Sequence, residues 1–182
     1  MNPLLEKFNT KYTSSPFEEI KEEHYLPAFQ ELVKTSEKEI DDITNNPEAP
    51  TFENTIEAMA FSGEQLDRVS NIFFNLNSAE TNDEIQKIAQ EVSPLLTEFS
   101  SKISQNEKLF ERIKSVYDQK DSLSLNEEQQ TLLNETYKGF VRSGALLSEE
   151  DKKKLEKINM DLSIKSLQFG QNALASTNAY FK

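Results

Sequence analysis

The stretch Ser15–Phe29 reads Ser-Pro-Phe-Glu-Glu-Ile-Lys-Glu-Glu-His-Tyr-Leu-Pro-Ala-Phe, and it sets where the helical part of the chain begins. Ser15 followed by Glu18 has the spacing of a capping box at a helix start. Pro27 would remove a backbone hydrogen bond from a helix interior, so the pattern predicts a short helix that stops near Glu22 and a second helix that starts there, with Pro27 in its first turn. Four apolar residues should anchor both helices to a core: Phe17, Ile20, Tyr25 and Phe29.

His24 lies at this junction and is the only histidine of the chain, which also has no cysteine. A zinc site normally needs three or four protein ligands, so we expect His24 to be packed and hydrogen-bonded to nearby backbone. The chain carries no His-Glu-x-x-His motif, no Gly-rich phosphate loop and no Gly-x-Ser-x-Gly elbow. Adjacent acidic residues such as Glu22 and Glu23 point to different helix faces and should be solvated. We therefore assign no catalytic, cofactor-binding or metal-binding residue to this chain.

Composition favours an all-α protein. The 182 residues include only 4 glycines and no tryptophan, and no run of β-branched residues alternates strictly between apolar and polar positions. We expect an antiparallel bundle of about six helices. No apolar run approaches the roughly 18 residues of a membrane span, and the start lacks a secretory signal pattern, so we expect a cytoplasmic location.

Charge argues against some classes of partner. The net charge is -12, and the only basic cluster, residues 152–154, directly follows three acidic residues. Nucleic acids and anionic membranes are bound through basic patches, because affinity comes largely from neutralised phosphates. The cluster is therefore typical of a solvated helix face, and we expect neither nucleic acid nor membrane as a partner.

Apolar residues that recur every three or four positions predict the first long helices. The helix over residues 22–44 should bury Phe29, Leu32, Val33, Ile40 and Ile43. A turn at residues 45–50 follows, and Thr51 should cap the next helix. One continuous helical stripe is predicted there: Phe52, Ile56, Met59, Gly63, Leu66, Ser70 and Phe73. Gly63 is expected to let a neighbouring helix approach closely.

Capping patterns mark the remaining helices. Thr81–Glu84 has the pattern of a capping box, and the helix after it should kink near Gln90 because Pro94 lies inside it. This helix should bury Ile85, Ile88, Val92, Leu95, Leu96, Phe99 and Ile103. A short helix should bury Leu109, Phe110, Ile113, Val116 and Tyr117. Asn126 should cap a helix that ends at Gly144 and bears Leu132, Leu133, Tyr137, Phe140 and Val141.

The last helix, opened by a capping box at Ser148–Asp151, has two apolar faces. Leu155, Ile158, Leu162 and Phe169 fall on one face, and Met160, Ile164, Leu167 and Leu174 fall near the opposite one. Tyr180 and Phe181 are still apolar where the sequence stops. We expect a helix buried on two sides, and a chain that is a fragment whose Met160–Leu174 stripe is bare without the missing portion.

Several segments, in order, resemble the start of thimet-type zinc metallo-oligopeptidases, and within that family the bacterial peptidyl-dipeptidase (dipeptidyl carboxypeptidase) type. The segments are Phe17–Ile20, His24–Phe29, Pro50–Ile56, Ser62–Val69, Phe73-Phe74, Thr81–Glu84 and Phe140–Ala145. The resemblance covers nearly the whole chain.

The resemblance implies a fragment of a large, mostly helical ellipsoid with a deep channel that admits short peptides. Family members hold zinc on a His-Glu-x-x-His helix and a downstream glutamate, and none of these has a counterpart here. Residues 1–182 are therefore expected to form a single non-catalytic N-terminal helical domain that lines the channel and packs on the catalytic portion of the same polypeptide, where the zinc resides. An alternative from another class is a free-standing acidic helical bundle that binds partner proteins through its last helix.

Overall fold

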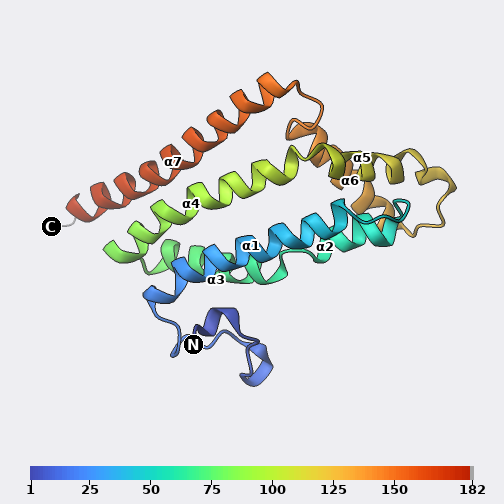
Figure 1. Cartoon of the computed structure of the whole chain (residues 1–182). Helices are drawn as coiled ribbons and strands as arrows, with labels where there is room; N and C mark the ends of the chain where they lie inside the picture. The colour runs from blue at the N-terminus through green and yellow to red at the C-terminus, as the bar shows by residue number, and fades with distance from the viewer. Residues whose placement is uncertain (181–182) are drawn as a thin grey trace. The chain divides into compact units, whose positions relative to one another are not determined.

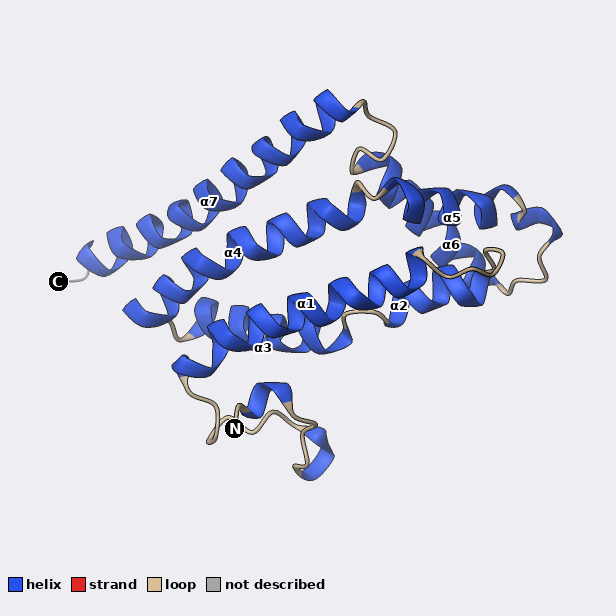
Figure 2. Ribbon diagram, in the orientation of Figure 1, coloured by secondary structure: helices blue, strands red, loops and turns tan. Residues whose placement is uncertain are grey.

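The computed structural model describes residues 1–180, and these fold into helices joined by turns and loops, without a strand (Figure 2). Six of the α-helices in this range have 12 residues or more. In chain order the α-helices are α1 (Tyr25–Thr44), α2 (Ala58–Phe61), α3 (Glu64–Ala79), α4 (Asp83–Ser104), α5 (Glu107–Asp118), α6 (Glu127–Arg142) and α7 (Glu149–Tyr180) (Figure 1). The all-α class predicted from composition is confirmed.

The chain divides into two compact units. Unit 1 consists of Met1–Thr35, Gly63–Thr97 and Ile158–Lys182, and unit 2 consists of Ser36–Ser62 and Glu98–Lys157. Each of the three longest helices, α1, α4 and α7, contributes residues to both units. That residues 1–182 form a single domain stays a prediction.

The core of unit 1 is an aromatic cluster from α1 and α3. Tyr25, Phe29 and Phe73 are fully buried. The ring centroid of Phe73 lies 5.0 Å from that of Tyr25, 5.5 Å from that of Phe29 and 5.2 Å from that of Phe74. Tilted and edge-to-face pairs at this range are the favourable arrangements of aromatic rings. The predicted core positions Tyr25, Phe29 and Phe73 are therefore confirmed.

The predicted helix between Ser15 and Glu22 is wrong, because these residues form only a turn. The backbone N–H groups of Glu19 and Ile20 both donate to the carbonyl of Pro16, and the helical geometry does not continue at residues 20 and 21. A single helical turn restricts several residues for very few hydrogen bonds, so it gains little without propagation. Phe17 consequently stays 57% exposed instead of anchoring a helix in the core.

The second helix starts as predicted. A 3₁₀ turn over Glu22–His24 leads into α1, and Pro27 lies in the first turn of α1. His24 is half-buried, and its Nδ1 accepts a hydrogen bond of 3.0 Å from the backbone N–H of Lys21. Its carbonyl accepts another of 2.8 Å from the side-chain amide of Asn2. The prediction of a packed, backbone-bonded histidine is confirmed.

The N-terminal segment of unit 1 packs on α3. Leu4 is fully buried, and Phe8 is nearly so. Gln65 donates to the Leu5 carbonyl at 2.8 Å, and the guanidinium of Arg68 lies 4.1 Å from the centre of the Phe8 ring. These contacts hold a segment with little regular structure against a helix.

The predicted continuous helix from Phe52 to Phe73 is wrong, because the helix is interrupted at Gly63. At the end of α2, the Met59 carbonyl accepts two hydrogen bonds from Ser62, one from the backbone N–H at 3.1 Å and one from the hydroxyl at 2.8 Å. Gly63 then adopts φ 74° and ψ 6°, a left-handed conformation that only glycine enters without cost. Phe52 accordingly belongs to the core of unit 2, and Phe73 to that of unit 1.

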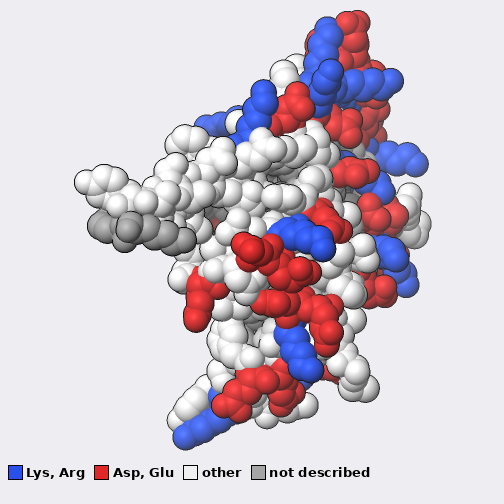
Figure 3. All heavy atoms as spheres, turned by 90° about the vertical axis from the view of Figure 1, so that its left-hand side faces the viewer, with Lys and Arg blue, Asp and Glu red and all other residues white. Residues whose placement is uncertain are grey.

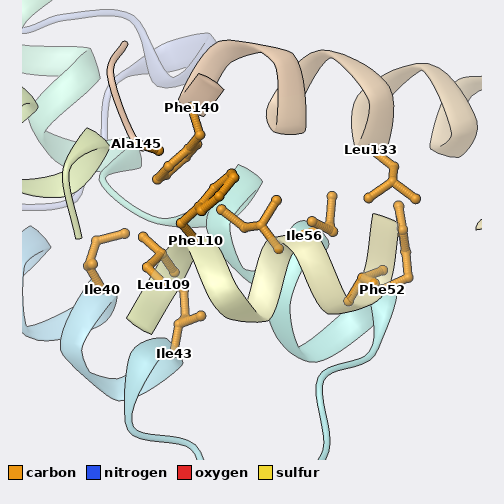
Figure 4. Packing of buried hydrophobic residues seen from close by; sticks show 11 residues of the cluster. Ile40, Ile43, Phe52, Ile56, Leu109, Phe110, Leu133, Phe140 and Ala145 are labelled. Carbon is orange, nitrogen blue, oxygen red and sulfur yellow. The ribbon is translucent and has the colours of Figure 1, made fainter. Parts of the chain in front are cut away.

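The core of unit 2 combines α1, α5, α6 and a single π-helical segment, Phe52–Glu57 (Figure 4). Its buried members are Ile40, Ile43, Phe52, Ile56, Leu109, Phe110, Ile113, Val116, Leu133, Phe140 and Ala145. Buried Arg112 donates to the carbonyls of Asn46 and Glu48, at 2.9 and 3.2 Å, and to Oδ1 of Asn54 at 3.1 Å. One guanidinium thus fixes the predicted turn at residues 45–50 and the start of the next helix.

Most predicted caps are confirmed. Thr51 and Asn126 each accept a backbone N–H three residues ahead, and Gly144 ends α6 with φ 95°. Besides Ser15, which starts only a turn, the exception is the cap of α4: Asn82, not Thr81, accepts the backbone N–H of Ile85, at 2.9 Å. Asparagine is among the preferred N-caps, and α4 starts one residue later than the capping-box pattern predicted.

The α4 helix bears out only part of its predicted core. Ile85, Ile88 and Val92 are buried, whereas Leu95, Leu96, Phe99 and Ile103 are only half-buried. Pro94 lies inside α4, which runs from Asp83 to Ser104. The predicted kink near Gln90 stays a prediction.

Candidate interface on the last helix

The start of the long helix α7 is held in unit 2 by a cap and by two ion pairs. Ser148 and Asp151 form the predicted capping pair, and the backbone N–H of Asp151 donates to the Ser148 hydroxyl at 3.2 Å. Lys152 is buried, and its Nζ lies 2.8 Å from a carboxylate oxygen of Glu107 and 2.9 Å from one of Glu149. These two hydrogen bonds raise the pKa of Lys152, and the bond from Lys152 lowers the pKa of Glu107.

In unit 1, one side of α7 contacts α4. Met160, Leu167 and Gln171 are half-buried on this side. The amide of Gln171 donates to the backbone carbonyl of Gln86 at 3.3 Å and accepts from the side chain of Gln90 at 3.0 Å. The amide of Gln171 therefore fixes which side of α7 is turned toward α4.

The opposite side of α7 is bare. Ile158 and Leu162 are each 60% exposed, and Phe169 is 76% exposed. At 100° per residue these three side chains lie within about 40° of one another around the helix axis. We call Ile158, Leu162 and Phe169 the outer apolar face.

This arrangement corrects the expectations for the last helix. In residues 1–180 the helix is covered on one side only, not on two. The barer stripe is the outer apolar face and not the predicted Met160–Leu174 stripe, of which Met160 and Leu167 are half-buried and Ile164 and Leu174 are 38% exposed. The two apolar faces have similar numbers of large apolar residues. Which face packs against the rest of the chain depends on contacts such as those of Gln171 with α4, which the helical pattern does not reveal. The Phe181 part of the expectation lies outside the described residues.

After Lys165, the remaining residues of α7 carry no charge. Between Lys165 and Lys182 the sequence has no Asp, Glu, Lys or Arg, although 29% of the chain is charged. Figure 3 shows a white area without Lys, Arg, Asp or Glu side chains, with acidic and basic side chains elsewhere on the same view. An exposed helix in water normally carries charges on its free side, so this composition is typical of a helix that is covered.

A groove of about 410 Å³ runs along this uncharged part of α7. Its lining comes from α7, from α3, and from the turn and first residues of α4, and includes Asn77, Thr81, Gln86, Gly170 and Leu174. Among residues 1–180, no charged side chain lines this groove. A Cβ placed on Gly170 would meet none of the described residues within 4 Å. The part of the chain that the structure describes therefore gives no packing reason for a helix-interior glycine, which costs about 1 kcal/mol relative to alanine.

The residues present do not fit a zinc ion. In residues 1–180 no three His, Cys, Asp or Glu side chains come together as a metal-binding group. His24 already uses Nδ1 to accept the Lys21 N–H. Nor does this part of the chain contain a helix both long and apolar enough to cross a membrane. What the described structure offers is a helical scaffold with an open apolar surface.

Comparisons with known proteins agree with this description. Residues 29–152 match the N-terminal domain of the neurolysin/thimet oligopeptidase family. The chain is 40% identical over 178 residues to dipeptidyl carboxypeptidase of Salmonella typhimurium and 37% identical over 179 residues to that of Escherichia coli; each alignment covers 98% of this chain and 26% of the relative. Oligopeptidase A of Salmonella typhimurium is 26% identical over 181 residues, which are 100% of this chain and 26% of that protein.

The chain is thus an all-α scaffold of a peptidase family. It belongs to the neurolysin/thimet oligopeptidase family and contains the N-terminal domain of that family. The resemblance seen in the sequence motifs is confirmed. The chain spans about a quarter of the length of the dipeptidyl carboxypeptidases that it matches.

Proposed function

We propose that this chain is the N-terminal helical domain of a zinc-dependent peptidyl-dipeptidase, an enzyme that releases dipeptides from the ends of short peptides. The observation that carries the proposal is the extent of the alignments. Almost the whole chain aligns with dipeptidyl carboxypeptidases at 37–40% identity, yet it accounts for only 26% of their length. The chemistry would then belong to a catalytic portion of the same polypeptide, and the chain alone would be inactive.

The potential metal ligands of this chain also support a catalytic site that lies outside residues 1–182. A catalytic zinc needs three protein ligands and an open position for water. One histidine, no cysteine, and no converging acidic group within residues 1–180 leave nothing to hold it here. Zinc, if the proposal is right, is bound by the catalytic portion, where it would supply an activated water.

The proposed role of the helices is to form part of the wall of the substrate channel. A rigid wall suits this chain, because both units have cores of tightly packed aromatic and aliphatic side chains. The net charge of -12 would attract basic peptides weakly and in a salt-dependent way. A cytoplasmic location remains part of the proposal.

The test compares this chain with the longer protein encoded by its gene. Both are incubated with an N-terminally blocked short peptide, and dipeptide release is followed by mass spectrometry with and without a chelator. We expect release only by the longer protein, loss of activity with chelator, and recovery with zinc. As a matched control, the glutamate of the downstream His-Glu-x-x-His motif is replaced by glutamine, which should leave the fold but remove activity.

Two results would overturn the proposal. One is a gene without a His-Glu-x-x-His motif in the several hundred residues that follow. The other is zinc-dependent peptidase activity of the 182-residue chain itself.

A further inference from the structure

We propose that the outer apolar face of α7, together with the uncharged residues of α7 after Lys165, is the docking surface for a helical segment of the same polypeptide that follows residue 182. This inference rests on the proposed function, since it takes the remainder of the longer peptidase as the occupant. It adds which surface is covered and what kind of segment covers it.

The outer apolar face exposes too much apolar side chain for a helix side that stays in contact with water. Ile158, Leu162 and Phe169 are 60%, 60% and 76% exposed on one side of one helix. Phe17, by comparison, is a single exposed phenylalanine beside Glu18 and Glu19, and single exposed apolar residues are ordinary. Clustered large apolar residues on one side of a helix are typical of a surface that another element covers.

Charge restricts the chemistry of the occupant. Residues 166–180 offer no charged partner, and the groove beside them is lined by amides, hydroxyls and apolar side chains. A charged group buried there would lose its hydration without an ion pair to replace it. The occupant is therefore an apolar, uncharged stretch. Lys165 lies on the outer apolar face as well, but its long stem allows the ammonium group to stay in water.

The shape of α7 favours a helix as the occupant. Ser166, Gly170, Ala173 and Thr177 recur at spacings of four, three and four, so they lie in one line along the helix. Phe169 borders this line on one side, and Leu167 and Leu174 border it on the other. Small residues between large ones form a furrow into which the side-chain ridge of a second helix fits. Gly170 is unexplained by the described contacts, and the close approach of such a helix would explain it.

A segment of the same polypeptide fits better than a second copy of the chain. The relatives aligned over 98% of this chain are almost four times as long, so about three quarters of such a protein lies outside the aligned region. A covalently joined segment is present at high effective concentration and does not pay the full entropy cost of association. A single helix face is small for a separate partner, because stable complexes bury roughly 1,200–2,000 Å².

The absence of cysteine allows a direct test by thiol labelling. Single variants Phe169→Cys and Leu162→Cys are made in both the 182-residue chain and the longer protein, with Lys157→Cys as an exposed control on the same helix. Alkylation rates at each position are read by peptide mass spectrometry, which separates them from any cysteine further along. Circular dichroism confirms that each variant keeps its helix content.

In the longer protein we expect Phe169→Cys and Leu162→Cys to react about tenfold or more slowly than in the 182-residue chain, because the thiol reacts only when the docked segment opens. Lys157→Cys should react at similar rates in both. A further variant, Gly170→Leu, should restore fast labelling at position 169 in the longer protein, while leaving the melting temperature of the 182-residue chain unchanged or higher.

Equal labelling rates in the two proteins would overturn the inference. Protection that appears in the 182-residue chain and grows with its concentration would also overturn it, since the occupant would then be a second copy. A longer protein that protects the face but lacks peptidase activity would remove the proposed function and keep the docking surface. An active peptidase whose outer apolar face is labelled fast would support the proposed function and overturn the docking surface.

Discussion

Replacing Gly63 by alanine distinguishes the observed break between α2 and α3 from a continuous helix. In the structure Gly63 has φ 74°, and alanine in the left-handed region costs about 1–2 kcal/mol. Alanine also restricts the unfolded chain, which offsets this by about 0.4–1 kcal/mol. We therefore expect Gly63→Ala to lower the free energy of unfolding by about 1 kcal/mol.

The matched control is Gly139, which lies inside α6; no atom of residues 1–180 comes within 4 Å of the place that an added methyl group would take. Gly139→Ala should raise the free energy of unfolding by about 0.5–1 kcal/mol, because a helix interior favours alanine. Urea unfolding followed by far-ultraviolet circular dichroism measures both variants. If Gly63→Ala stabilised the chain as Gly139→Ala does, the helix would run through residue 63 and the described break would be refuted.

Three other substitutions test the cores and the ion pair. Phe73→Ala should lower the free energy of unfolding by about 3–5 kcal/mol, because it removes the central ring of a buried aromatic cluster. Phe61→Ala, at a position that is 72% exposed, should be nearly neutral. Similar urea midpoints for both variants would contradict this prediction. Arg112→Met should cost about 2 kcal/mol or more in the same assay, since it removes the three hydrogen bonds that the buried guanidinium donates to Asn46, Glu48 and Asn54. An unchanged urea midpoint would show that the guanidinium is dispensable. Glu107→Gln should be destabilising at neutral pH and lose its effect in acid. The hydrogen bond from Lys152 lowers the pKa of Glu107, so the contribution of the ion pair to stability disappears as pH falls through that pKa. Urea midpoints of variant and parent that differ equally at every pH would count against the ion pair.

The fold followed from the sequence where local chemistry and tertiary packing agree. Thr51, Asn126 and Ser148 sit directly before apolar helical stripes, and each caps the helical segment that starts directly after it. Gly144, which follows the stripe of α6, ends that helix as predicted.

Two predicted helices differ from the structure for physical reasons. The helical spacing continues through Gly63, so periodicity alone indicates one helix, while the glycine permits the left-handed conformation that divides it. The capping pattern at Ser15 is present, but the turn that follows is too short to propagate, and Phe17 remains exposed.

The candidate interface was only half visible in the sequence. The two apolar faces of α7 were recognised, but which one is bare depends on the hydrogen bonds of Gln171 to α4, which join residues more than 80 positions apart. A signal that could have helped is the run of 16 residues without charge that ends at Phe181, because an exposed helix in so acidic a chain would otherwise carry carboxylates and lysines.

Zinc content tests the division between scaffold and catalyst most directly. The 182-residue chain and the longer protein are each dialysed against buffer with trace zinc, and metal per polypeptide is measured by inductively coupled plasma mass spectrometry. We predict a stoichiometric, chelator-removable zinc in the longer protein and only background zinc in the chain. Stoichiometric, tightly held zinc in the chain itself would contradict the account.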